Sequence, residues 1–228
     1  MKKKFTEMLE TLKITITDEK YEKFVMFYEI LVEWNKNINL TSITNFDDVF
    51  MKHFYDSLCL VKGVELKHQK LLDVGSGAGF PSIPLKIVFE DLDITIIDSL
   101  NKRIKFLEAL TESLNIEVKL IHGRVEEHKL TNYYDIVTAR AVSNLRILTE
   151  LCLPFVNVGG IFVALKGPKY KEEYENSKNV VKLLGGELIN TIEYEVDYQK
   201  RALILIKKMI KTKKQYPRSY GKIKNKPL

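Results

Sequence analysis

The segment of this 228-residue chain best suited to bind a small molecule is a glycine-rich turn after a short apolar stretch. Residues 71–81 read Leu-Leu-Asp-Val-Gly-Ser-Gly-Ala-Gly-Phe-Pro, so that Gly75, Gly77 and Gly79 alternate along the turn. Glycine lets a backbone turn sharply and approach a ligand without an intervening Cβ atom. Open α/β sheets bind ligands at the carboxyl ends of their strands, so this turn indicates a binding site. A tight turn with a purely structural role is the alternative.

Two further positions narrow the kind of ligand. A G-x-G-x-x-G dinucleotide pattern needs glycine at position 80, where this chain has Phe80. Asp98 ends the second predicted strand, and a carboxylate there can accept hydrogen bonds from both ribose hydroxyls of an adenosine-containing cofactor. It could equally cap the helix that opens at Asn101. The loop from His122 to Glu127, after the third predicted strand, would adjoin the same crevice and contact an adenine, or form a charged surface loop.

The end of the fourth predicted strand, Thr138 to Ala141, is informative for what it lacks. Enzymes that methylate exocyclic amines usually place Asn or Asp followed by Pro-Pro and an aromatic residue here, and this chain does not. A pyrimidine C5 methyltransferase needs a nucleophilic thiolate, commonly in a Pro-Cys pair. In this chain the nearby proline, Pro154, follows Cys152 instead of preceding it. Cys152 also lies in an apolar helix, so we expect it in the core. Both absences favour an acceptor atom that needs neither a base nor a covalent intermediate.

The elements that position these residues change in character along the chain. Residues 1–66 are expected to form a helical extension, 67–208 a Rossmann-like domain and 209–228 a basic tail. Apolar residues at helical spacing predict one helix with Asp18 as its N-cap, ending near Trp34, a core residue. A second predicted helix begins near Asn45 and ends at Gly63.

From Lys70 onward, compact β-branched runs alternate with helical segments, which is typical of a parallel sheet with helices on both faces. The last two runs are too close for a helical crossover and predict an antiparallel hairpin. The sequence therefore predicts an α/β fold with a seven-stranded sheet ending in that hairpin. Its strands are expected at residues 71–74, 94–97, 118–121, 136–139, 161–165, 188–196 and 201–206.

Charge is unevenly distributed. Net charge is 0 over residues 1–70 and −3 over 71–206, whereas 207–228 hold nine basic and no acidic residues. Such a tail indicates a polyanionic partner, since Lys and Arg can replace condensed counterions; a solvated tail is the alternative. The longest apolar stretch, Leu151–Leu165, is too short and broken to span a bilayer, and Glu7 and Glu10 interrupt any secretory signal. We expect a cytosolic protein, with a monomer as the simplest state and no metal site.

Seven spaced motifs, covering nearly the whole chain in order, together resemble a known family: the bacterial small-subunit ribosomal RNA methyltransferase G, also called glucose-inhibited division protein B. The motifs are Lys52 to Leu58, Leu72 to Pro84, Asp98-Ser99 with Asn101 to Arg103, His122 to Glu127, Tyr134 to Ala141, Lys166-Gly167, and Tyr216 to Arg218 with Gly221 and Lys226 to Leu228. The tail departs from the family pattern at Tyr220, where relatives carry a small residue, and at Ile223, where they carry a proline.

The resemblance implies a class I enzyme that uses S-adenosylmethionine to methylate N7 of guanosine 527 in the 530 loop of 16S ribosomal RNA, either as RNA or in the small ribosomal subunit. It also implies that Gly75, Phe80, Val125-Glu126 and Arg140 contact the cofactor, with Asp98 on the ribose. Two alternatives stay open: an oxidoreductase that holds NAD on Gly75, Gly77 and Asp98, and an RNA-binding module without catalysis.

Guanine N7 carries a lone pair and no proton, so no general base is expected and catalysis should be mainly positioning. Candidates for contact with guanine O6 or with phosphates are Arg124, Arg140, Lys166 and Arg218, although each could be an ordinary surface cation or ion-pair partner. Because the methylated base is cationic, phosphate contacts are favoured.

Two further expectations concern the N-terminal helical layer and the C-terminal tail. His53 is expected to pack in the helical layer, with Asp56 on the same helix face to orient it. Loss of residues 212–228 should weaken RNA binding and leave cofactor affinity nearly intact.

Overall fold

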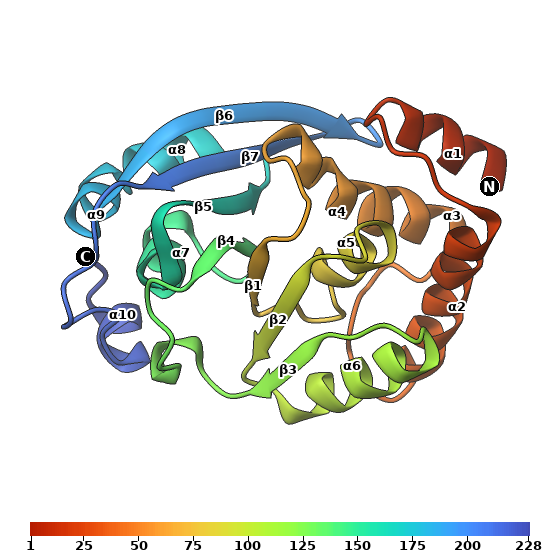
Figure 1. Ribbon diagram of the computed structural model, residues 1–228, viewed down its shortest axis with the longest axis horizontal. Coiled ribbons are helices and arrows are strands. Elements are labelled where there is room, and N and C mark those ends of the chain that lie inside the picture. The colour runs from red at the N-terminus through yellow and green to blue at the C-terminus, as the bar shows by residue number, and fades with distance from the viewer.

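A computed structural model describes residues 1–228 as a seven-stranded sheet between two layers of helices (Figure 1). The strand order is β3-β2-β1-β4-β5-β7-β6. The strands are β1 (Lys70–Val74), β2 (Asp93–Asp98), β3 (Lys119–His122), β4 (Tyr134–Arg140), β5 (Val156–Lys166), β6 (Gly186–Val196) and β7 (Gln199–Lys208).

The pairing confirms the predicted sheet. Strands β1 to β5 pair in parallel, and β7 runs antiparallel to both β5 and β6. All seven strands lie where the β-branched runs predicted them. The largest difference is β5, which begins five residues earlier than expected, at Val156 rather than Ile161. The start of this strand could not be predicted from the sequence because Gly159 and Gly160 interrupt its apolar pattern.

Helices cover the two faces of the sheet separately, as Figure 1 shows. One face carries the N-terminal layer together with α5 and α6, and the other carries α7 to α10. The helices are α1 (Lys2–Glu10), α2 (Asp18–Asn35), α3 (Phe46–Val49), α4 (Asp56–Leu58), α5 (Ser82–Val88), α6 (Asn101–Ser113), α7 (Leu145–Cys152), α8 (Tyr170–Glu175), α9 (Lys178–Leu183) and α10 (Tyr220–Asn225).

The predicted N-terminal helices need three corrections. The N-cap of α2 is Thr17, whose hydroxyl accepts from the amide of Lys20, and Asp18 is the first helical residue. Helix α1 was not predicted, although it buries Phe5 and Leu9. The second predicted helix does start at Asn45 and end at Gly63, but it contains a π-helical turn at Phe50–Tyr55 and ends in a 3₁₀ turn, Cys59–Lys62.

Strand β7 shows how one sheet serves two cores. Leu203 and Leu205 pack into the core beneath the N-terminal layer, whereas Ala202, Ile204 and Ile206 pack into the core beneath α7 and α9. Successive side chains of a strand point to opposite faces, so a central strand must be apolar throughout. The aromatic side chains Phe5, Phe24, Phe27, Phe50 and Phe54 fill the first of these cores.

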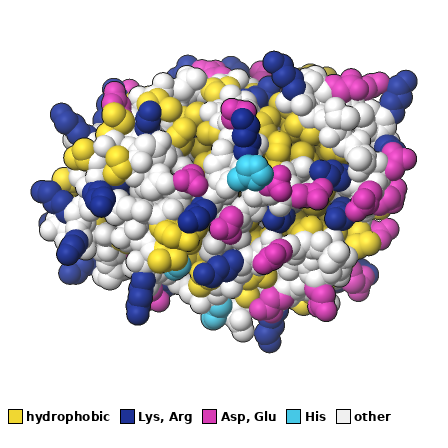
Figure 2. Space-filling view, viewed as in Figure 1, with side chains coloured by type: hydrophobic (Ala, Val, Ile, Leu, Met, Phe, Trp, Pro, Cys, Tyr) yellow, Lys and Arg dark blue, Asp and Glu magenta, His cyan; other side chains and the backbone are white.

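The C-terminal tail is folded against the second layer. Helix α10 contacts α7, and Ile223 is fully buried. An apolar side chain therefore anchors the segment to the body, while its lysines stay exposed. Lys and Arg side chains are numerous on the left of Figure 2, where α9 and α10 lie in Figure 1, while Asp and Glu gather mainly on the right. No helix is long and apolar enough to cross a membrane.

Candidate functional site

A cleft of about 400 Å³ opens where β1, β2 and β4 end, at the carboxyl edge of the parallel strands. Twenty-one residues line it, among them Gly75, Gly77, Phe80 and Asp98. The amide of Gly75 donates to Ile97 O at 2.8 Å, so the turn is tied to the neighbouring strand. This volume lies in the range of small-molecule sites, about 300–1,000 Å³.

The three glycines of the turn differ in what surrounds them. Gly77 has φ +63°, and no heavy atom lies within 4 Å of the position that a Cβ would take, so a side chain there would enter the open cleft. A Cβ on Gly75 would come within 2.9 Å of Val142 Cγ2. Gly79 does not line the cleft; a Cβ there would meet Ile83 Cγ1 at 2.6 Å. Gly79 thus allows α5 to pack, and of the three glycines only Gly75 and Gly77 line the cleft.

Asp98 joins the end of β2 to the glycine turn. Its Oδ2 accepts from the amide of Gly77 at 3.2 Å and lies 3.4 Å from Arg103 Nη1, while Oδ1 accepts from the amide of Leu100 at 2.9 Å. A carboxylate oxygen has two lone pairs, so Oδ1 can still accept from a ligand hydroxyl. The alternative role weighed for Asp98 is wrong, because the N-cap of α6 is Leu100 and no side chain caps the helix. Asp98 instead lines the cleft and accepts from the Leu100 amide just before α6.

The loop after β3 supplies another part of the cleft wall. Arg124, Val125 and Glu126 all line the cleft, and the side chains of Val125 and Glu126 are largely buried. The guanidinium carbon of Arg124 lies 4.4 Å from the centre of the Tyr220 ring, which comes from the C-terminal tail and lines the same cleft. The tail therefore contacts the cleft, and the sequence did not predict this contact.

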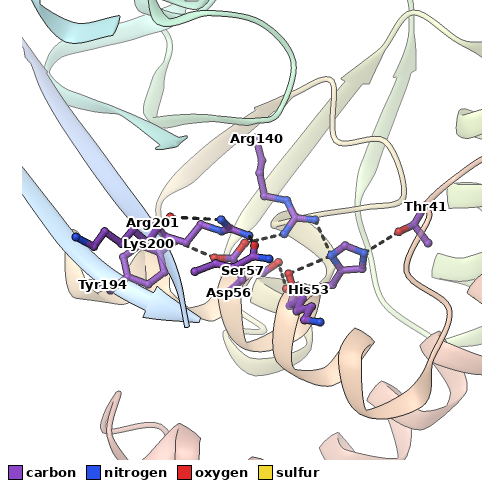
Figure 3. A network of polar contacts seen from close by, with 10 residues as sticks. Thr41, His53, Asp56, Ser57, Arg140, Tyr194, Lys200 and Arg201 are labelled. Carbon is purple, nitrogen blue, oxygen red and sulfur yellow. Dashed lines mark hydrogen bonds and ion pairs between the residues drawn. The ribbon is translucent and has the colours of Figure 1, made fainter. Parts of the chain in front are cut away.

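Arg140, at the end of β4, lies at the centre of a polar network (Figure 3). Its Nη1 donates to Asp56 Oδ2 at 2.9 Å and its Nη2 contacts His53 Nδ1 at 3.2 Å. Tyr194 donates to the other oxygen of Asp56 at 2.9 Å. The expectation that Asp56 orients His53 is wrong: both carboxylate oxygens are used by Arg140 and Tyr194, which the sheet brings from 84 and 138 residues away.

His53 packs in the helical layer, as expected, and also lines the cleft. It stacks on Phe80 with ring centres 4.6 Å apart. Its Nδ1 lies between two groups of opposite kind: Arg140 Nη2 at 3.2 Å, which can only donate, and Lys52 O at 3.1 Å, which can only accept. Its Nε2 is hydrogen-bonded to Thr41 Oγ1 at 2.8 Å. Burial, assisted by the charge of Arg140, lowers the pKa of His53 to about 3. The imidazole is therefore neutral at physiological pH.

A second cavity of about 750 Å³ adjoins the cleft and shares with it the side chains of His53, Arg140 and Val142. Lys166 lines this second cavity rather than the cleft. Its ammonium contacts Glu173 Oε2 and Ser143 O, both at 2.7 Å, and the side chain is 6% exposed. The other basic side chains of this cavity are Lys52 and Arg201, and Arg201 donates only to the neutral acceptors Gln199 Oε1 and Lys200 O.

Arg218 lies outside both cavities. Its Nε and Nη2 donate to Glu150 at 2.7 and 2.6 Å, and the Glu150 side chain is 1% exposed. This bidentate, buried pair fixes the tail to α7, so the structure gives Arg218 the ion-pair role that was weighed against substrate contact.

Several residues of the cleft were not singled out in the sequence. Ser76 Oγ and Arg103 Nε are buried without a hydrogen-bond partner, and both residues line the cleft. Asp73, beneath the turn, accepts from Ser82 Oγ at 2.6 Å, and burial raises its pKa to about 7. The glycine motif contained Ser76 and Asp73, but no spacing signal distinguished them from structural residues.

Cys152 is fully buried, and burial raises the pKa of its thiol, so this side chain belongs to the core as predicted. No three His, Cys, Asp or Glu side chains are grouped so that they could hold a metal ion.

The sheet order, the terminal hairpin and a cleft at the strand ends define a class I S-adenosylmethionine-dependent methyltransferase fold. Solved structures share it: TYW2 from M. jannaschii in complex with AdoMet aligns with a TM-score of 0.59 at 13% identity, over 74% of this chain and 80% of that one. A putative S-adenosylmethionine-dependent methyltransferase from Methanococcus maripaludis gives 0.57 at 16% identity, over 81% and 93%.

Sequence comparison identifies the family. The family model of rRNA small subunit methyltransferase G matches residues 20–204. The protein of that name from Staphylococcus saprophyticus is 47% identical over 98% of this chain and 96% of its own length, and the one from Ligilactobacillus salivarius is 46% identical over 98% of each. The chain belongs to the rRNA small subunit methyltransferase G family, which confirms the resemblance found in the motifs.

Proposed function

We propose that this protein transfers a methyl group from S-adenosylmethionine to N7 of a guanosine in 16S ribosomal RNA, the one at position 527 in the 530 loop. One observation carries the proposal: a cleft suited to an adenosine cofactor and a cavity lined by Lys and Arg share Arg140 as a common wall. A methyl donor on one side of that wall would lie next to a nucleotide on the other.

The residues of the cleft fit this cofactor. Asp98 offers a carboxylate oxygen to a ribose, and the backbone at Gly75 and Gly77 leaves room for the methionine part. The unpartnered Ser76 Oγ and Arg103 Nε are polar atoms that a ligand with carboxylate and hydroxyl groups can satisfy. Val125 and Glu126 would flank the adenine ring. When bound, the cofactor supplies an electrophilic methyl group on a sulfonium centre.

Methyl transfer to guanine N7 requires the protein mainly to position the two reactants. Guanine N7 has a free lone pair, so the site needs no group to remove a proton. His53, the only imidazole lining the cleft, is neutral, and its two ring nitrogens contact Arg140, the Lys52 carbonyl and Thr41. Both ring nitrogens thus have partners within the protein, and an acceptor such as N7, which carries no proton, fits such a site.

Charge balance also supports the proposal. Methylation makes the guanine ring cationic, and an isolated arginine beside it would oppose that charge. Arg140 is not isolated, because Asp56 lies 2.9 Å from its Nη1 with both side chains largely buried. The pair is neutral overall, while the guanidinium keeps N–H groups for O6 or for a phosphate. Arg140 can therefore orient the base without a large electrostatic cost.

Two of the remaining cations fit contacts with RNA phosphates. Arg201 lines the second cavity without a carboxylate partner, and Arg124 lies at the rim formed with the tail. In the same cavity, Lys52 and Lys166 are already paired with carboxylates of the protein. Phosphate contacts fix the position of a nucleic acid without reading its sequence. We infer that the enzyme acts as a monomer in the cytosol, where its RNA substrate is made.

The dinucleotide-binding alternative is set aside by membership of a methyltransferase family. The remaining alternative, an inactive RNA-binding module, is tested by incubating the pure protein with labelled S-adenosylmethionine and small subunits lacking the modification, followed by mapping of the label. We expect one N7-methylguanosine in the 530 loop. Label on an exocyclic amine or at another nucleotide would overturn the assignment, and no transfer to 16S RNA or to subunits would favour the inactive module.

A further inference from the structure

The C-terminal tail reaches the cofactor cleft. Tyr220, the first residue of α10, lines the cleft alongside Arg124 and Glu126. The guanidinium carbon of Arg124 is 4.4 Å from the centre of the Tyr220 ring, which is a cation–π distance. Tyr220 therefore borders the cofactor space and also contacts Arg124, whose side chain forms the next part of the cleft wall.

The tail is held in this position at several points. The backbone amide of Arg218 donates to Glu150 Oε1 at 3.1 Å, in addition to the two guanidinium bonds. Ile223 is fully buried in the core beneath α7. Beyond α10, Arg146 Nη2 donates to Pro227 O at 3.1 Å, and its Nε donates to Leu228 O. These contacts hold α10 at both ends, so Tyr220 lies against the cleft whenever the tail is docked.

The same short helix presents positive charge to the solvent. Lys222, Lys224 and Lys226 are all exposed, and none of the three is in an ion pair. Unpaired lysines of this kind bind phosphates with release of counterions. Tyr220, in contrast, faces the cleft. The tail around α10 therefore carries one side chain that lines the cleft and a surface of exposed lysines.

We propose that Tyr220 belongs to the cofactor site and that α10 couples the two ligands, so that RNA bound to its lysines strengthens cofactor binding. The proposal rests on the function proposed above. A ligand that stabilises the docked tail stabilises the wall of the cleft, and by thermodynamic reciprocity the cofactor then strengthens RNA binding by the same factor. Because the wall contains one aromatic side chain from the tail, we expect a factor of about five, at the lower end of such couplings.

The first test is calorimetry with S-adenosylhomocysteine in the absence of RNA. Tyr220→Ala should weaken binding about fivefold, and Tyr220→Phe should retain it, because the ring face and not the hydroxyl supports Arg124. Tyr198→Ala is the matched control, since Tyr198 is 97% exposed in the β6–β7 turn and should have no effect. Wild-type affinity in Tyr220→Ala would overturn the proposal.

The second test repeats the titration with a saturating 16S RNA fragment that contains the 530 loop. Wild-type affinity for S-adenosylhomocysteine should rise about fivefold. The Lys222→Ala/Lys224→Ala variant should bind S-adenosylhomocysteine normally alone but gain less from RNA. An unchanged wild-type affinity with RNA would overturn the coupling. Failure of the wild type to bind S-adenosylhomocysteine at all would instead overturn the proposed function, and this inference with it.

Discussion

The N-terminal layer and the C-terminal tail both supply side chains to the cofactor cleft, but different forces hold them. Thr41 and His53 come from a layer packed by aromatic rings, in which Phe27 stacks on Phe80 at 5.3 Å and Phe80 stacks on His53. Tyr220 comes from a tail held by the Arg218–Glu150 pair, one buried isoleucine and hydrogen bonds from Arg146. We infer that the layer fixes the geometry of catalysis, and that the tail can respond to a ligand.

The largest expected effect is loss of the tail anchor. Glu150→Gln removes the charge that pairs with Arg218, and breaking a buried ion pair by removing one partner costs about 3 kcal/mol. Because the remaining anchors are the buried Ile223 and the hydrogen bonds from Arg146 at the surface, we expect the tail to detach, so that proteases cleave within residues 209–219 before the body unfolds. Glu175→Gln is the control, since Glu175 pairs with Lys178 on the exposed surface. Equal resistance to proteolysis in the wild type and Glu150→Gln would show that the tail does not depend on this pair.

On the N-terminal side, the corresponding change is Asp56→Asn. It leaves Arg140 without its counter-charge and loosens its orientation, and a misplaced catalytic contact typically costs about 100-fold in rate. We expect kcat to fall by about this factor, with a much smaller change in affinity for S-adenosylhomocysteine. Asp18→Asn, an exposed carboxylate in the same layer, serves as the control. An unchanged kcat would remove Asp56 from the positioning network.

A smaller effect is expected for Gly77→Val. The new side chain enters the open cleft, so affinity for S-adenosylhomocysteine should fall at least about tenfold, which corresponds to about 1.4 kcal/mol. Gly159→Val is a matched control for backbone strain, because Gly159 also has a positive φ and open space but lies in β5 away from the cleft. If the two variants bind the ligand equally well, the turn does not contact it.

The last effect is absent at neutral pH and concerns the neutral imidazole of the N-terminal layer. Burial lowers the pKa of His53 to about 3, against an ordinary value of 6.5, so between these pH values the unfolded chain binds the proton and the folded one does not. The free energy of unfolding should therefore fall as the pH drops from 6.5 to 3, by at most about 1.4 kcal/mol per pH unit from this site.

This pH dependence can be assigned by comparing urea unfolding of the wild type with His53→Gln, which should have a shallower dependence in that window. His68→Gln is the control, since His68 lies on the surface with its side chain 78% exposed. An identical pH dependence in His53→Gln and the wild type would show that His53 does not titrate differently in the folded and unfolded states.

The sequence predicted the sheet and the strand-end residues well, for a physical reason. Buried parallel strands must be apolar on both faces, which makes them visible as short β-branched runs, and their carboxyl ends necessarily meet at one edge. Gly75, Gly77, Asp98 and Arg140 could therefore be placed near one another from their positions along the chain. Gly79 could not be distinguished from them, because its role depends on the packing of Ile83.

The partners of charged side chains could not be predicted. Lys166 meets Glu173 nearby in the chain, but Arg218 meets Glu150, 68 residues earlier, and Asp56 meets Arg140, 84 residues later. Pairings of this kind depend on how the two helical layers dock on the sheet, and no local pattern encodes it. The same is true of Tyr220, whose place in the cleft follows from the docking of the tail.

The most direct test of the account is a crystal structure of the protein with S-adenosylhomocysteine. We predict the ribose on Asp98, the adenine between Val125 and Tyr220, and the sulfur atom directed toward Arg140 and the second cavity. A ligand bound elsewhere, or one whose sulfur faces away from Arg140, would contradict the arrangement of donor and acceptor on which the proposed methyl transfer depends.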